Sequence, residues 1–209
     1  SVIVTSSLGT SGAASLEIAA SATSFAVGQG FTVPANCNIA KIQVQVKKNG
    51  TPTNNVVCRI QTDTAGKPSG TTITNGSSNS VAISSFSTSF SLIEFTFATP
   101  PAVTSGTQYH FILDPDGYSA GNGGTLDLST NDYANGTSEA SNNAYSWTSY
   151  PDYDAIFKVF STDVVLQSYS EATIKQQGSY SLKGIAQVGS SLNDTLIRTL
   201  TSTAVLDLR

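Results

Sequence analysis

Apolar and polar residues alternate with a period of two along much of the chain. The clearest runs are residues 41–47, 56–61 and 93–97, where Ile, Val, Cys or Phe alternates with Lys, Gln, Arg, Glu or Thr. Successive side chains of a strand point to opposite faces, so each run predicts a strand with one buried face. Residues 49–55, rich in Asn, Thr and Gly, separate the first two runs, and we predict that these runs pair as a hairpin.

Further strands are predicted at residues 109–113 and 155–160, with Gly, Pro and Asp between the strands. Short strands separated by such turns are typical of a sandwich. The sequence therefore predicts an all-β protein, built as a jelly-roll-like antiparallel β-sandwich with an additional small β segment at its C-terminus. The side chains assigned to the core are Val44, Val46, Cys58, Ile60, Phe95, Phe97, Phe111, Phe157 and Val159.

The pattern divides the chain into three parts. Residues 1–24 are expected to form an N-terminal strand segment, residues 25–163 the sandwich, and residues 164–209 a small β segment. This last segment is rich in Val, Leu and Ile, but it is too short to bury them by itself. We expect it to dock on the sandwich or to add strands to a neighbouring subunit, with Ser1–Ser7 as a candidate exchange partner.

The composition changes the picture of the surface. Ser, Thr, Asn and Gly make up 31, 26, 13 and 17 of the 209 residues, while charged residues are only 11% and the net charge is −4. Without a basic cluster, nucleic-acid binding is not expected, and no apolar run is long enough to predict membrane insertion. This hydroxyl- and amide-rich surface favours an extracellular, cell-surface or virion location. Because the chain starts at Ser1, we expect it to be a processed or excised piece.

The residues of common catalytic and metal sites are scarce. The single histidine, His110, lies in an apolar strand-like run and is interpreted as a packed or surface strand residue. No nucleophile elbow, phosphate loop or zinc motif is present. A glycosidase-type carboxylate pair at Asp152 and Asp154 is conceivable, but a solvated pair before a strand is the favoured interpretation. We therefore expect a protein that is not an enzyme and has no cofactor.

Two cysteines, Cys37 and Cys58, are the remaining reactive groups. An oxidising compartment would allow a disulfide between them. The predicted hairpin register does not bring them opposite each other, so two buried thiols that behave as small apolar residues are the alternative. Both interpretations are open at this point.

Residues 118–154 form a long region rich in Asn, Gly, Ser and Tyr that contains the single tryptophan. Sugar rings stack on exposed aromatic side chains, and carboxylates and amides bind their hydroxyls. Calcium is a weaker possibility at Asp114 and Asp116, which lack the full loop pattern. The alternative is that Trp147 plugs one end of the sandwich and that the tyrosines pack the loop. The candidate carbohydrate-binding residues are Trp147, Tyr145, Tyr150, Tyr133, Asp132, Asn142 and Asp152.

Several motifs occur in a recognisable order: residues 27–31, 39–50, 66–71, 93–97, 106–111 and 154–160. In order and spacing they resemble the jelly-roll repeats of phage tail and virion proteins and of bacterial secreted surface proteins, including choice-of-anchor domains. Residues 178–183, Gly-Ser-Tyr-Ser-Leu-Lys, look like the opening of a second jelly roll of the carbohydrate-binding-module type. The resemblance implies a structural or adhesive module of a virion tail, fibre, capsid decoration or extracellular surface assembly, with self-assembly or neighbouring structural subunits as partners. The alternative is a carbohydrate-binding module or lectin-like receptor-binding domain that binds glycans.

Overall fold

The computed structural model describes residues 1–5, 11–130, 133–143, 145–162, 167–171 and 181–185. The chain divides into two units, residues 1–163 and residues 164–209. Within the described ranges the structure has no helix of the length and apolar character needed to cross a bilayer. The first unit contains the short 3₁₀ helix η1 (Ile83–Ser85) and the strands β1 (Val2–Thr5), β2 (Ala14–Ile18), β3 (Ala26–Phe31), β4 (Cys37–Asn49), β5 (Asn55–Thr64), β6 (Lys67–Ala82), β7 (Ser91–Thr96), β8 (Ala102–Val103), β9 (Tyr109–Pro115), β10 (Gly123–Thr130), β11 (Ser138–Ser141), β12 (Trp147–Tyr150), β13 (Tyr153–Ala155) and β14 (Phe157–Ser161).

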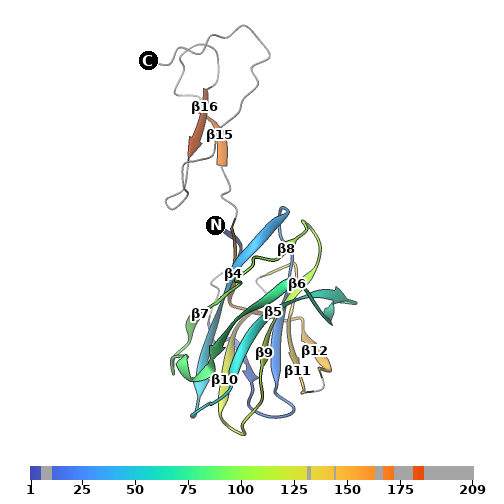
Figure 1. Ribbon diagram of the computed structural model, residues 1–209, viewed down its shortest axis with the longest axis vertical. Helices are drawn as coiled ribbons and strands as arrows, with labels where there is room; N and C mark the ends of the chain where they lie inside the picture. Colours follow the sequence, from blue (N-terminus) through green and yellow to red (C-terminus); the bar gives the residue numbers. More distant parts are fainter. Residues whose placement is uncertain (6–10, 131–132, 144, 163–166, 172–180, 186–209) are drawn as a thin grey trace. The chain divides into compact units, whose positions relative to one another are not determined.

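These strands form two antiparallel sheets that pack face to face, so the predicted all-β sandwich is confirmed (Figure 1). One sheet has six strands in the order β12-β11-β3-β9-β5-β6. The other has eight: β1-β14-β4-β10-β13 form its main path, β2 pairs with β10, and β7 and β8 pair with β4. Both strands of residues 1–24 therefore belong to the eight-stranded sheet.

The space between the sheets is filled by the apolar faces of the alternating strands. Strand β4 contributes Ile42, Val44 and Val46, and all three side chains are fully buried. The nine side chains that the alternation assigned to the core all belong to one buried apolar cluster. The strand faces were therefore predicted correctly, since a shift of one residue would have placed the opposite set inside.

The predicted hairpin between residues 41–47 and 56–61 is wrong. Strand β4 pairs with β7, β8, β10 and β14, whereas β5 pairs with β6 and β9, so the two runs lie in different sheets and their apolar faces share the core. Alternation indicates which face of a strand is buried but does not identify its partner. The tight hairpin joins β5 to β6 instead, where Ala65 and Gly66 both have positive φ, 54° and 78°. Two consecutive left-handed residues match the twist of antiparallel strands.

The two cysteines do not form a disulfide with each other. Cys37 begins β4 and Cys58 lies in the middle of β5, so they are on strands of different sheets. Burial raises the pKa of the Cys58 thiol, which keeps it protonated and unreactive. Of the two interpretations offered by the sequence, the structure has the unbridged one.

The unit of residues 164–209 is described only at β15 (Gln167–Glu171) and β16 (Ser181–Ile185), which pair antiparallel. Gln167 lies opposite Ile185, and Glu171 lies opposite Ser181. The rest of the predicted β segment, residues 164–166, 172–180 and 186–209, lies outside the described residues. The expected completion of this segment by another subunit depends largely on those residues and stays a prediction.

Candidate functional site

A cleft of about 340 Å³ lies on the outer face of the six-stranded sheet. Its floor is formed by β5, on which Val56, Cys58 and Ile60 point into the core, so the alternate residues Arg59 and Gln61 point outward. We call it the Tyr145 cleft. Its lining residues are Arg59, Gln61, Gly70, Thr72, Asp114 and Tyr145.

One wall of the cleft comes from residues 67–76 of β6, here named the β6 wall. Between the pairs Gln61↔Thr72 and Arg59↔Ser77, five residue steps of β6 oppose only two of β5, so β6 bulges out of regular pairing. At the start of this wall the Lys67 ammonium donates a 3.0 Å hydrogen bond to the carbonyl of Trp147 on β12. Because β6 and β12 are opposite edges of the sheet, the β6 wall reaches across the outer face.

The other wall is Tyr145, in the turn between β11 and β12. Its φ is +55°, a conformation that is uncommon for a residue with a side chain and that is often found at functional sites. The backbone N–H of Tyr145 donates to the Asn142 carbonyl at 3.0 Å. The ring packs edge-on against Phe25, at 5.9 Å between centroids, and lies 6.5 Å from Trp147, yet the residue is 44% exposed.

Hydrogen bonds fix Tyr145 in this place. Its hydroxyl donates to Asp114 Oδ1 at 2.6 Å, and the other oxygen of Asp114 accepts from Arg59 Nε at 2.5 Å. Arg59 also donates from Nη1 to Ser77 at 3.0 Å. Burial, together with the hydrogen bond to Asp114, raises the pKa of Tyr145 to about 12, so the phenol stays protonated and remains a donor. The cleft thus has a rigid aromatic wall and a paired Arg–Asp floor.

Beside the cleft lie three ionisable residues, the buried His110 and Glu139 and the partly exposed Asp63, which we call the His110 cluster. Nε2 of His110 lies 2.8 Å from Asp63 Oδ1, and Nδ1 lies 2.9 Å from Glu139 Oε1. The second contact is an ion-pair distance whose geometry does not meet that of a hydrogen bond. His110 is 1% exposed and Glu139 is fully buried, although both are on the outer face of the sheet.

The His110 cluster spans three strands because β3, which separates β9 from β11, carries glycine at the facing positions. A Cβ atom on Gly28 would lie 2.9 Å from the Phe111 carbonyl oxygen and 3.3 Å from Glu139 Oε2. A Cβ atom on Gly30 would lie 3.3 Å from His110 Cε1. The two glycines therefore leave the space in which the side chains of β9 and β11 meet.

Burial and the contact between Glu139 and His110 shift the pKa values of these two residues in opposite directions. Burial raises the pKa of Glu139, and His110 only partly offsets this. Burial opposes protonation of His110, but contact with Glu139 and then with Asp63 outweighs it, so the pKa of His110 is raised. His110 and Glu139 are shielded from solvent, whereas the Asp63 side chain remains 27% exposed at the edge of the cluster.

The structure brings together two of the seven predicted carbohydrate-binding residues. Tyr145 forms the cleft wall, and Trp147 lies beside it, half-buried against Phe25, Ala26 and Ile112. Tyr150 lies at the far end of β12 from Trp147, and Asn142 supplies turn hydrogen bonds to Tyr145 and Ser146.

The other predicted residues do not share this site. Asp152 is exposed in the turn between β12 and β13, and Asp132 lies outside the described residues. The structure corrects the expectation that Tyr133 binds carbohydrate, because this residue is only 9% exposed and packs edge-on against Phe157 in the core. It therefore lacks the open ring face that stacking on a sugar needs.

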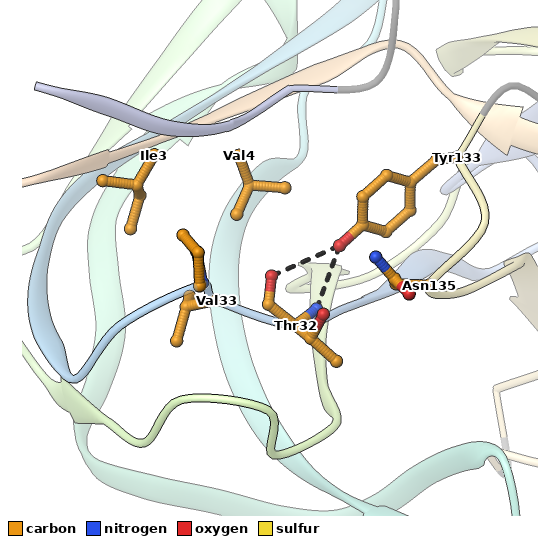
Figure 2. Close-up of a pocket in the computed structure, with 7 residues that line it drawn as sticks. Ile3, Val4, Thr32, Val33, Tyr133 and Asn135 are labelled. Atoms are coloured by element: carbon orange, nitrogen blue, oxygen red, sulfur yellow. Dashed lines mark hydrogen bonds between the residues drawn. The ribbon is translucent and has the colours of Figure 1, made fainter.

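Tyr133 instead borders a second hollow, of about 370 Å³, which Figure 2 shows. Its hydroxyl accepts a 3.0 Å hydrogen bond from the Thr32 backbone N–H and donates to the Thr32 carbonyl at 3.3 Å (Figure 2). The rest of the lining includes Ile3, Val4 and Val33. Because the Tyr133 ring is buried whereas the Tyr145 ring is 44% exposed, this hollow is a weaker candidate than the Tyr145 cleft.

Asp152 and Asp154 do not form a carboxylate pair on one face. Asp152 is exposed, whereas Asp154 is fully buried inside the sandwich. The Asp154 carboxylate accepts hydrogen bonds from Gln29 Nε2 and from the Tyr133 backbone N–H, both at 2.8 Å. Asp154 is therefore part of a structural polar network, and the two-carboxylate geometry of a glycosidase is not present at this pair.

The residues considered for calcium are each held by groups of this chain. Asp114 binds Arg59 and Tyr145, while Asp116 accepts hydrogen bonds from Asn54 and Asn55, which lower the pKa of Asp116. Calcium takes oxygen ligands, and an adjacent guanidinium repels it. Among the described residues, no group of three His, Cys, Asp or Glu side chains is arranged to hold a metal ion.

Arg59, Gln61 and Thr72 were not predicted as site residues, because polar residues on the outward face of a strand are ordinarily interpreted as solvent-exposed. Also not predicted were the polar contacts of His110, which link residues 47 and 29 positions away. The glycines at alternate positions 28 and 30 were a usable signal, since glycine inside a strand often marks a close approach of another part of the chain.

No family model matches the chain, and neither the curated proteins nor the solved structures contain a significant match. The resemblance to choice-of-anchor and carbohydrate-binding repeats therefore stays a prediction.

Proposed function

We propose that residues 1–163 form a non-catalytic adhesive module that binds carbohydrate in the Tyr145 cleft, and that it works at a cell surface or on a virion. The observation that carries this proposal is the Tyr145 ring, exposed yet held rigid by Asp114 at the edge of a polar cleft. A rigid ring loses little conformational entropy on binding, and its face matches the apolar face of a sugar. The polar floor supplies partners for hydroxyl groups.

The sheet edges also favour a binding module over a subunit that polymerises by edge-to-edge strand pairing. Among the described strands, the edge strand β1 has only four residues and a register shift between Val2 and Val4, and β8 has two residues. The long edge strand β6 is interrupted by bulges. Short or bulged edges hinder pairing with another chain. A structural role in an ordered assembly, if it exists, is expected to use residues 164–209.

The test is a glycan array followed by isothermal titration with the best oligosaccharide. Tyr145→Ala is expected to weaken binding at least about tenfold, because a stacking ring is lost. Tyr118→Ala is the matched control: Tyr118 is 47% exposed and also packs edge-on against Phe25, but it does not line the cleft. Absence of binding to any glycan, or equal loss in both variants, would overturn the proposal.

A further inference from the structure

The charges that line the Tyr145 cleft are already paired with each other. Arg59 Nε donates to Asp114 at 2.5 Å, and the second Asp114 oxygen accepts the Tyr145 hydroxyl at 2.6 Å. The remaining charged groups around the cleft are Asp63 and Glu139, which contact His110, and Lys67, which is bonded to the Trp147 carbonyl. Arg59 is therefore the cation among the residues that line the cleft, and its charge is offset by Asp114, whereas Lys67 keeps its charge but does not line the cleft.

Neutral hydrogen-bonding groups, in contrast, are left open. Gln61 is 6% exposed and its Oε1 accepts from the Gly70 backbone N–H at 2.8 Å. Its Nε2 has no hydrogen-bond partner among the described residues, and the side chain lines the cleft. The Thr72 hydroxyl across from it also makes no hydrogen bond within the described part of the chain. An amide donor held in place with no partner is suited to a ligand acceptor.

We infer that the cleft selects a neutral sugar unit with unsubstituted hydroxyls and disfavours sulfated or uronic-acid sugars. Sugar hydroxyls both donate and accept, so one can accept from Gln61 Nε2 while another exchanges hydrogen bonds with the Thr72 hydroxyl or donates to the Asp114 carboxylate. The sugar ring packs against Tyr145. A volume of about 340 Å³ is near the lower end of ligand pockets, which suits one sugar unit. This inference rests on the proposed function and names its ligand class.

The experiment compares oligosaccharides of the same backbone in neutral, 6-O-sulfated and uronate forms, with glucan, galactan and mannan series titrated into the full chain. The wild type is expected to bind one neutral series at least about tenfold more tightly than its acidic forms. Gln61→Ala should weaken neutral binding about tenfold, the usual effect of losing one well-placed hydrogen bond. Thr72→Val should weaken it less.

Asp114→Asn is the decisive variant, because it removes the carboxylate that neutralises Arg59. It should reduce the preference for neutral over acidic sugars, while Asp152→Asn, the same charge change outside the cleft, should leave the preference unchanged. Melting curves check that each variant is folded. Tighter binding of acidic forms by the wild type would overturn this inference and leave carbohydrate binding intact. Failure of every series to bind would overturn the proposed function and this inference with it.

Discussion

The two faces of the six-stranded sheet are stabilised by different kinds of interaction. On β9, Phe111 and Leu113 point into the sandwich and contact other apolar side chains, whereas His110 points outward and contacts two carboxylates. Both faces are buried at this strand, but the inner one is apolar throughout, whereas the outer one combines the polar His110 with the apolar Ile112. An apolar face tolerates many partners of similar volume, while a buried polar face needs particular partners at particular distances. The outer face is therefore more specific and easier to disrupt by small chemical changes.

The largest expected effect is on the inner face. Phe111→Ala should lower the free energy of unfolding by about 3–5 kcal/mol, because the fully buried ring packs against Phe31 and Phe157 and its loss leaves a cavity. Reversible denaturation by urea measures this change. A loss below about 1 kcal/mol would contradict the burial of this face.

A smaller loss is expected on the outer face. Glu139→Ala should cost about 1–3 kcal/mol, because it leaves the buried His110 without one of its two partners. Ser141→Ala is a control on the same strand, since the buried Ser141 hydroxyl has no hydrogen-bond partner in the described part of the chain and should be dispensable. Equal losses in the two variants would indicate that packing alone holds this face.

The two faces should also differ in their dependence on pH. The pKa values of His110 and Glu139 are both raised in the folded protein, so the folded state keeps protons that the unfolded state releases. Their contribution is fully present below the unfolded pKa values, about 4.5 for Glu139 and 6.5 for His110, and is lost as pH rises through the folded ones. Unfolding at pH 5.5, 7 and 8.5 should show falling stability in the wild type. The double variant His110→Gln with Glu139→Gln should flatten this slope, whereas Phe111→Leu should not.

Tyr145→Phe should have a still smaller effect on stability, below about 1 kcal/mol, because the hydroxyl that it removes lies at the surface. The ring remains, so sugar binding should weaken only a few-fold, through its looser position. Thermal melting and titration measure the two quantities. Binding as weak as in Tyr145→Ala would mean that the hydroxyl, and not the ring, makes the main contact.

Deletion of residues 164–209 should leave the melting temperature of the sandwich unchanged. The described core residues all lie within residues 4–159, so the sandwich has its own core. Calorimetry of the shortened chain checks this, and size-exclusion chromatography with light scattering shows whether the oligomeric state depends on the deleted segment. A lower melting temperature would mean that the segment stabilises the sandwich.

The inner face could be predicted from the sequence because burial on one side leaves a period-two signature, visible at residues 42–46 and 93–97. Strand pairing could not be predicted from the sequence. Strands β4 and β5 show the same alternation, although they belong to different sheets. Of the cleft, Tyr145 and Trp147 were predicted from their residue type. Arg59 and Gln61 were not, because their role depends on the three extra residues of β6 opposite them, and a bulge of that kind has no simple sequence pattern.

The pair of glycines on β3 has a consequence for how this protein can change over generations. Any side chain at position 28 or 30 would enter the space that Glu139 and His110 share. A change at one of the four positions should therefore require a compensating change at another, and alanine at 28 would also need the Phe111 backbone to shift. In a set of homologous chains, positions 28, 30, 110 and 139 should vary together, although the first and last are more than a hundred residues apart.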